Sequence, residues 1–384
     1  MTFLVRHRLD LVILTAAAAI QWAFRQWFLR SRPSPLLRQG SGWVVLAVWC
    51  WLAAAVVLEI HRIAVHFPPV FVGWFRGGAL LYSVLSLATF PAVFLASRIR
   101  RPAAGAHPGR RYFLETARAA LIAAPVATVG YGVFVQRSRF RLREVDLPCA
   151  GLPPDLNGLR LVQLSDIHLS PFLSVKELEY NVDMANETRA HVALVTGDLI
   201  SGYGDPLDAC LDRLSRLRAD AGILGCLGNH EKYAEVEDYT ALEGARRGIR
   251  FLRRQSAPLR FGGAALRFTG VDYEKMGGPY LGGMERFVDP AAYNILLSHN
   301  PDVFPTASRK GFRVTLSGHT HGGQVNFEIL EQSVNVVRFF TPYVYGLYRR
   351  GPSAIYVTRG IGTVGVPARI GAPPEVALLR LCAI

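Results

Sequence analysis

The first 145 residues contain no lysine and only four acidic side chains, but they contain 18 arginines. This part of the chain therefore carries the whole net charge of +14, because the 25 basic and 25 acidic residues of the remainder cancel. Arginines beside apolar segments are typical of the ends of membrane spans. A nucleic-acid interface would place the excess charge on the globular part, so we expect no nucleic-acid partner.

Two further features are missing: cysteine pairs anywhere in the chain, and charged residues at the centres of its apolar runs. The five cysteines form no CxxC pair and no framework spacing, which favours isolated thiols over a thiolate metal site or a set of disulfides. No ionisable residue stands at the centre of an apolar run, although a proton relay or an ion pathway would normally need one. The sequence therefore argues against transport as the function of this chain.

Four apolar segments flanked by arginine predict a membrane-spanning region over residues 1–145. A helix that spans a bilayer needs about 20 apolar residues, so the first segment is short and has a signal-like or an interfacial segment as its alternatives. We expect a multi-pass protein of the cell membrane with the lipid bilayer as a partner. The four segments are Leu11–Phe24, Trp43–Leu58, Gly77–Ala96 and Ala119–Val135.

The arginine pair Arg110-Arg111 stands before an aromatic-leucine pair and an apolar stretch, which resembles a twin-arginine export signal. The alternative is the ordinary positive charge of a cytoplasmic loop. Both interpretations place the loop 98–118 in the cytoplasm and the following domain outside. The two sides differ little in charge, with 10 arginines against 8, and arginines also follow the fourth segment. We therefore predict an extracytoplasmic catalytic domain, and the small excess of arginine on the opposite side of the membrane is the support for this orientation.

From residue 146 to 384 short apolar runs alternate with amphipathic stretches, which is typical of βα units. The pattern predicts an α/β domain whose first half is βα and whose second half is richer in strands. Helices are expected at Val175–Arg189 and Pro206–Arg218. Strands are expected at Leu159–Leu164, Val192–Thr196, Ile223–Leu227, Ala265–Val271, Tyr293–Ser298, Arg313–Ser317, Ala354–Thr358 and Val376–Leu381.

Five short polar motifs each follow a predicted strand. Ligands of an open α/β sheet gather beyond the carboxyl ends of its strands, so these five loops can meet in one place. The motifs offer carboxylates, imidazoles and an amide oxygen as metal ligands, and they contain no thiolate. Such a ligand set suits Mn, Fe or Zn. The motifs are Asp166-Ile167-His168, Gly197-Asp198, Gly228-Asn229-His230, Ser298-His299-Asn300 and Gly318-His319-Thr320-His321.

The spacing within the motifs also favours a metal centre. Asp166 and His168 are two residues apart, so in an extended segment both side chains lie on one face and can bind one metal ion. His319 and His321 repeat this spacing. Two metal ions about 3.5–4 Å apart need a bridging carboxylate, for which Asp198 is the candidate. Five of the six histidines after residue 145 lie in these motifs, and His191, the sixth, is expected to be structural.

The ordered motifs resemble those of the calcineurin-like metallophosphoesterase superfamily, and the stretches around Ser317–Gln324 and Arg359–Gly362 are similar to a bacterial membrane-associated or exported phosphodiesterase branch. The resemblance covers about Arg160–Gln324 and implies a four-layer α/β sandwich after the transmembrane helices. It implies that two divalent metal ions are bound, that His230 contacts the phosphoryl oxygen or protonates the leaving group, and that Glu231 orients His230. The implied ligands are Asp166, His168 and His321 for one metal, Asn229, His299 and His319 for the other, and Asp198 as the bridge.

The predicted function is hydrolysis of a phosphodiester or a pyrophosphate by metal-activated hydroxide, with a lipid-linked or envelope substrate as a further hypothesis. One alternative is a cytoplasmic-facing nucleotide-sugar pyrophosphatase of the UDP-diacylglucosamine type. Another is a catalytically silent sensor or adaptor. Two further features stay open: Arg359 is a phosphate ligand or part of an ion pair, and Tyr343, Tyr345 and Tyr348 form a lid or pack in the interior.

Overall fold

A computed structural model of the chain describes residues 8–30, 33–58, 61–64, 66–99, 107–275, 277–329 and 332–384. The chain divides into two compact units. One comprises residues 1–135 with 365–368, and the other comprises residues 136–364 with 369–384. Each unit is described by itself.

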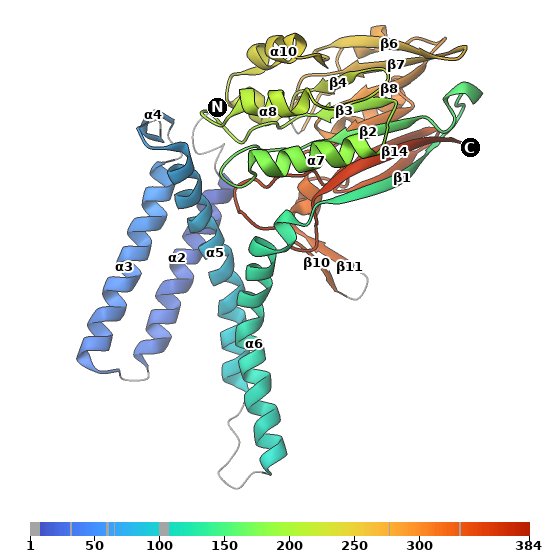
Figure 1. Ribbon diagram of the computed structural model, residues 1–384. Helices are drawn as coiled ribbons and strands as arrows, with labels where there is room; N and C mark the ends of the chain where they lie inside the picture. The colour runs from blue at the N-terminus through green and yellow to red at the C-terminus, as the bar shows by residue number, and fades with distance from the viewer. Residues whose placement is uncertain are drawn as a thin grey trace. The chain divides into compact units, whose positions relative to one another are not determined.

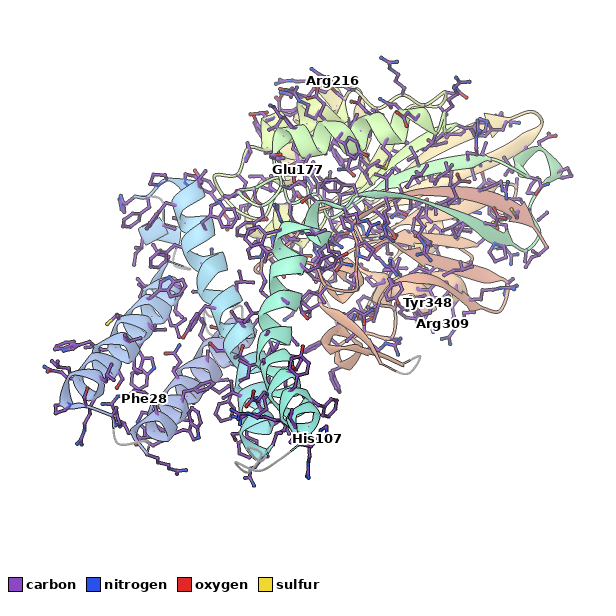
Figure 2. The ribbon with its side chains drawn as sticks, turned by 60° about the horizontal axis from the view of Figure 1, so that its bottom comes forward. Phe28, His107, Glu177, Arg216, Arg309 and Tyr348 are labelled. Atoms are coloured by element: carbon purple, nitrogen blue, oxygen red, sulfur yellow. The ribbon has the colours of Figure 1, made fainter. Side chains whose placement is uncertain are left out.

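The helices of the first unit begin where proline and capping side chains favour a helix start. Proline stands at the start of three of them, where its missing N–H costs no intrahelical hydrogen bond. The Nδ1 atom of His107, labelled in Figure 2, accepts a hydrogen bond from the amide of Gly109 at 3.2 Å. The helices are α2 (Arg8–Leu29), α3 (Pro35–Val57), α4 (His61–Ala64), α5 (Pro69–Arg98) and α6 (Pro108–Phe134).

Three helices within the described residues are long and apolar enough to span a membrane, which corrects the expected four. They cover Pro35–Val57, Pro69–Arg98 and Pro108–Ser138. The expected first span lies in α2, a helix of 22 residues that is not among them. Charged residues at Asp10 and Arg25 leave only the stretch 11–24 free of charge, which is shorter than the bilayer core.

The expected cytoplasmic loop 98–118 is also shorter in the structure. Helix α6 begins at Pro108, so Arg110 and Arg111 lie in its first turn rather than in a loop. Arg111 Nε lies 3.0 Å from Glu115 Oε1 one turn later, and both side chains are exposed. Residues 100–106 of that prediction lie outside the described residues.

The second unit contains two six-stranded sheets and a hairpin. The first sheet has the order β1-β14-β2-β3-β4-β5, in which β2 to β5 run parallel and β14 pairs parallel with β1 but antiparallel with β2. Its strands are β1 (Arg141–Cys149), β2 (Arg160–Leu164), β3 (Val192–Thr196), β4 (Ile223–Cys226), β5 (Ile249–Phe251) and β14 (Glu375–Ala383).

The second sheet has the order β12-β13-β9-β8-β7-β6, with the four central strands parallel and both edge strands antiparallel to their neighbours. Its strands are β6 (Gln255–Phe261), β7 (Ala264–Gly270), β8 (Tyr293–Leu297), β9 (Val314–Ser317), β12 (Gly346–Arg350) and β13 (Ser353–Val357). The hairpin consists of β10 (Asn326–Ile329) and β11 (Gln332–Asn335).

The two sheets pack face to face and helices cover their outer faces. Figure 1 shows α7 (Val175–Glu187), α8 (Leu207–Leu214) and α10 (Glu237–Arg246) on the outer face of the first sheet. Buried side chains such as Leu194 and Ile295 fill the space between the sheets. The second outer layer is thin and contains α11 (Phe304–Arg309) and the short helices η3 (Met284–Phe287) and η4 (Pro301–Val303). The predicted α/β sandwich is therefore confirmed.

The central strands are buried along their whole length, which explains why the sequence shows them as continuous apolar runs. Every residue of β3 and β8 is buried. Strands that are covered on both faces need apolar side chains at every position. By contrast, β1 and β6 are largely exposed, and neither strand was predicted from the sequence.

Candidate metal centre

The carboxyl ends of five strands deliver the eight predicted residues. Loops after β2, β3 and β4 of the first sheet carry the first five, and loops after β8 and β9 of the second sheet carry the other three. Parallel strands end at the same edge of a sheet, so each sheet presents its loops on one side. The eight residues are Asp166, His168, Asp198, Asn229, His230, His299, His319 and His321.

Seven of these side chains form three overlapping groups in which the potential ligand atoms lie within 4.8 Å of one another. In the first group His168 Nε2 lies 3.1 Å from His321 Nε2, and Asp166 Oδ1 lies 3.4 Å from that same atom of His321. The groups are Asp166, His168 and His321; His168, Asp198 and His230; and Asp198, His299 and His319.

Asp198 lies between the first group and the third. Its Oδ2 atom is 3.5 Å from His168 Nε2 and 3.0 Å from His299 Nε2. One carboxylate therefore contacts an imidazole of each group, which is the position that a bridging ligand would need.

Asn229 completes the set from the loop after β4. It is 5% exposed, and it lies between Gly228, which packs against the Asp198 carboxylate, and His230, whose backbone amide donates a hydrogen bond to Asp198 Oδ1 at 2.9 Å. Asn229 Oδ1 and Asp166 Oδ2 are buried and have no hydrogen-bond partner among the described residues. A buried polar atom without a partner costs about 1–3 kcal/mol, and a cation would remove that cost. The residues present thus fit a divalent metal centre with nitrogen and oxygen ligands.

Burial and charge together set the protonation of the site. Burial lowers the pKa of His168 to about 4 and that of His319 to about 3, so both imidazoles are neutral, as metal ligands must be. Burial acts on His299 in the same direction, but the Asp198 and Asp166 carboxylates outweigh it and raise its pKa to about 10. Burial raises the pKa of Asp166 to about 6. The His299 imidazole therefore holds a proton at neutral pH that a bound metal ion would displace.

Five of the eight residues adopt left-handed backbone conformations, which side chains other than glycine rarely do. Such conformations cost about 1–3 kcal/mol each and persist only where surrounding contacts fix them. The amide of His168 donates to the carbonyl of Asp198 at 3.0 Å, and the amide of His319 donates to Asp166 Oδ1 at 2.8 Å. The five φ angles are 50° at Asp166, 47° at His168, 55° at Asp198, 75° at His319 and 53° at His321.

Two glycines let the ligand loops approach one another closely. A Cβ atom on Gly228 would lie 2.1 Å from Asp198 Oδ1, and one on Gly318 would lie 2.2 Å from Asp166 Oδ2. Both distances are far below contact distance, so neither position accepts a side chain while the carboxylate keeps its place.

Comparison with known proteins agrees with this geometry. Residues 159–323 match the family described as calcineurin-like phosphoesterase. The chain contains a calcineurin-like metallophosphoesterase domain. This domain is a metal-dependent phosphoesterase domain, and the predicted resemblance is confirmed.

Relatives of this metallophosphoesterase domain occur in bacteria and vertebrates. The metallophosphoesterase YkuE of Bacillus subtilis is 29% identical over 281 residues, which are 71% of this chain and 97% of the relative. A transmembrane protein with metallophosphoesterase domain from Danio rerio is 33% identical over 292 residues, which are 70% of this chain and 63% of the relative. The chain thus spans less than two thirds of the latter. The solved sulfate thiohydrolase SoxB of Thermus thermophilus matches with 13% identity and a TM-score of 0.35, over 60% of this chain and 57% of that one.

Within the metallophosphoesterase domain, Glu231 has different partners from the one expected. His230 Nδ1 donates to the backbone carbonyl of Ser201 at 2.5 Å. The Glu231 carboxylate instead accepts hydrogen bonds from the amides of Asp198, Leu199 and Gly228 at 2.6–3.0 Å. The expectation that Glu231 orients His230 is therefore wrong, because backbone amides of the ligand loops occupy both carboxylate oxygens.

Arg369 is a residue of the metallophosphoesterase domain that the sequence did not reveal. Its side chain is fully buried, and its guanidinium donates to the carbonyls of Arg359, Gly360, Gly362, His321 and Ala372. It also lies 3.5 Å from His321 Nδ1. Arg369 thus connects the loop of His321 to the loop that follows β13. A single arginine among apolar residues gives no pattern from which this role could be predicted.

The open question about the tyrosines is answered separately for each. The Tyr343 and Tyr348 rings lie 5.3 Å apart, and Tyr343 also packs on Phe304 at 5.7 Å. These two half-buried rings pack against the buried cluster that contains Phe304. Tyr345 differs, because the guanidinium carbon of Arg359 lies 4.3 Å from its ring centroid. His191 accepts a hydrogen bond from the Arg160 amide at 3.0 Å, as expected for a structural histidine.

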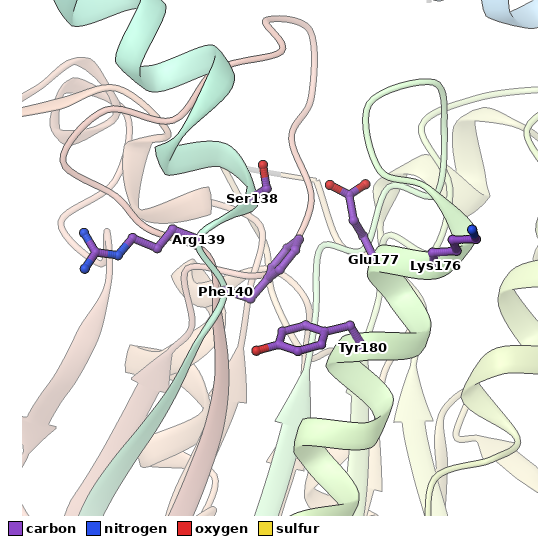
Figure 3. A pocket seen from close by; sticks show the side chains of 6 residues that line it. All are labelled: Ser138, Arg139, Phe140, Lys176, Glu177 and Tyr180. Atoms are coloured by element: carbon purple, nitrogen blue, oxygen red, sulfur yellow. The ribbon is translucent and has the colours of Figure 1, made fainter.

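A pocket in the second unit lies apart from the ligand loops. Ser138, Arg139, Phe140, Lys176, Glu177 and Tyr180 line it. Figure 3 shows the Arg139 and Lys176 side chains directed away from each other. The Glu177 carboxylate accepts hydrogen bonds from the amide and hydroxyl of Ser174, both at 2.8 Å, and so caps α7. This pocket gathers no set of groups suited to phosphoester chemistry.

Proposed function

We propose that the chain is a membrane-anchored phosphoesterase that uses two divalent metal ions to hydrolyse a phosphodiester or a pyrophosphate. One observation carries the proposal: loops of two sheets bring seven acidic and imidazole side chains into three overlapping groups, and the Asp198 carboxylate contacts an imidazole of the first group and of the third. We also propose that residues 1–145 form the membrane region and residues 146–384 the catalytic domain, since the candidate spans all begin before residue 109.

The residues have distinct roles in this proposal. The metal ions supply an acidified water and neutralise charge on the phosphoryl oxygens. Asp198 fixes the position of both ligand groups, and the Ser201 carbonyl anchors His230 Nδ1, so that Nε2 is left to contact a phosphoryl or leaving-group oxygen. The proposed ligands are Asp166, His168 and His321 for one ion, Asn229, His299 and His319 for the other, and Asp198 for both.

Metal removal tests the proposal. We expect the purified full-length protein to contain about two equivalents of Mn, Fe or Zn per chain by elemental analysis, and to hydrolyse bis-p-nitrophenyl phosphate. Chelation should abolish turnover, because the proposed reaction depends on water acidified by the metal ions, and adding manganese should restore it. Full turnover in the chelated, metal-free protein would contradict the proposal.

We further propose that the catalytic domain faces the outside of the cell membrane and acts on a lipid-linked or envelope substrate. The support comes from the sequence. Arg110-Arg111 is either an export signal or the positive charge of a cytoplasmic loop, and both interpretations place the domain outside. Protease added to intact spheroplasts should then digest residues 146–384, while a cytoplasmic marker protein stays intact. Protection of the domain until the membrane is permeabilised would reverse the orientation and favour a cytoplasmic-facing pyrophosphatase.

A further inference from the structure

Arg359 follows a strand that ends beside the loop of His319 and His321. Strand β13 pairs parallel with β9, with Val357 opposite Ser317, and the amide of Thr358 donates to the carbonyl of Ser317 at 3.0 Å. The residue after β13 therefore emerges at the edge where the His319 loop begins. A sixth strand end thus places Arg359 next to the ligand loops.

Backbone contacts fix the start of the Arg359 side chain. Its amide donates to Glu375 Oε1 at 3.2 Å, and its carbonyl accepts from Arg369 at 2.9 Å. The stem passes directly over Gly322, where a Cβ atom would lie 2.8 Å from Arg359 Cγ. Because Gly322 follows His321, the stem lies against the ligand loop itself.

The guanidinium is held by an aromatic face rather than by a carboxylate. It stacks on Tyr345 at 4.3 Å, and its Nε atom is buried without a hydrogen-bond partner. Across residues 107–275, 277–329 and 332–384, no acidic side chain forms an ion pair with Arg359. The interpretation of Arg359 as part of an ion pair therefore lacks an acidic partner among these residues. Because the guanidinium stacks through its face, the N–H groups along its edge remain able to bind an anion.

Tyr345 is itself tied to the ligand loop. The hydroxyl of Thr320, which stands between His319 and His321, donates to the carbonyl of Val344. The amide of Val344 donates to the hydroxyl of Tyr348 at 3.0 Å. The ring beneath Arg359 thus keeps a fixed position beside two proposed metal ligands.

We propose that Arg359, stacked on Tyr345, binds an anionic phosphate next to the phosphoryl group that is hydrolysed, so that the centre favours pyrophosphates over diesters with uncharged flanks. A cation beside two metal ions is favourable only when the substrate supplies additional negative charge. Arginine binds phosphate in a bidentate manner, and hydrogen bonds between charged groups are stronger than those between neutral groups. The inference rests on the proposed function and specifies its substrate class.

The test compares two substrates that differ by one phosphate, bis(uridine 5′) monophosphate and bis(uridine 5′) diphosphate, on the full-length metal-loaded protein. The wild type should have the higher kcat/KM for the diphosphate. Arg359→Ala should lower kcat/KM for the diphosphate by about 10- to 100-fold, mainly through KM, and change that for the monophosphate less than about threefold. Tyr345→Leu should show a smaller loss of the same kind, and guanidinium ions should partly rescue Arg359→Ala.

Arg349→Ala is the matched control, because Arg349 is an exposed arginine of β12, and it should leave both substrates unaffected. Metal content and unfolding temperature should stay the same in all variants. Equal losses on both substrates in Arg359→Ala, or no preference for the diphosphate in the wild type, would overturn the inference while leaving the proposed function intact. Absence of turnover on these substrates and on bis-p-nitrophenyl phosphate would instead defeat the proposed function.

Discussion

Asp198→Asn is expected to abolish phosphoesterase turnover, with kcat reduced by at least about 10³-fold, or roughly 4 kcal/mol of lost transition-state stabilisation. The amide is the same size as the carboxylate and keeps an oxygen to accept the His230 amide hydrogen bond, so the fold should persist. It removes the negative charge that stands between His168 and His299. Two dications then lack their shared counter-charge, and metal content should fall to one equivalent or less per chain.

Asp208→Asn provides the control for this prediction. Asp208 is an exposed carboxylate of α8 whose partners, Arg247 and Tyr239, both lie outside the ligand loops. Turnover and metal content should both match the wild type. If Asp198→Asn keeps two metal ions and more than a tenth of the wild-type kcat, Asp198 does not bridge the centre.

Arg369→Met is expected to lower the unfolding temperature of the catalytic domain by about 10 °C. The change leaves buried carbonyls of Gly362, His321 and Ala372 without their donor, which costs about 3–5 kcal/mol in total. For a domain of this size each kcal/mol shifts Tm by about 2–4 °C. Differential scanning calorimetry of the detergent-solubilised protein measures the shift.

Arg380→Met is the control for Arg369→Met, because it removes the charge of an exposed arginine instead of a buried one. Arg380 forms a two-pronged pair with Asp146 at 2.7 Å, but both side chains are exposed. Exposed pairs contribute little to stability, so Tm should barely change. A drop for Arg380→Met as large as that for Arg369→Met would show that loss of any arginine, rather than loss of the buried donor, destabilises the domain.

The ligand residues were predictable because their positions follow from strand ends. His168 and His321 come from different sheets and are 153 residues apart, yet each lies four residues beyond a buried strand that any periodicity analysis finds. The roles of seven of these residues as ligands, and of His230 as a contact to the phosphoryl group, stay predictions until metal content and activity are measured. Arg369 and Tyr345 could not be found in this way, because their partners are backbone carbonyls and a guanidinium, which leave no pattern in the sequence.

The fold was predictable where strands are covered on both faces and not where they are exposed. Strand β3 was predicted with its observed bounds. Strand β1 alternates arginine with apolar residues and is exposed over its first four residues, so it resembled the charged end of a span. Helix α2 is apolar over 14 residues, which is enough to suggest a span from composition but too few to cross the bilayer core.

The place of β14 in the first sheet has a consequence for biosynthesis. Strand β1 follows the candidate span almost directly, but β14 separates it from β2. The strand next to the span therefore has no partner until residues 375–383 have left the ribosome, and β2 keeps one open edge for the same time. Unpaired strand edges promote aggregation, so a chaperone or the translocation machinery must shield the half-made sheet. A chain truncated before Glu375 would keep both edges open and would accumulate as insoluble material.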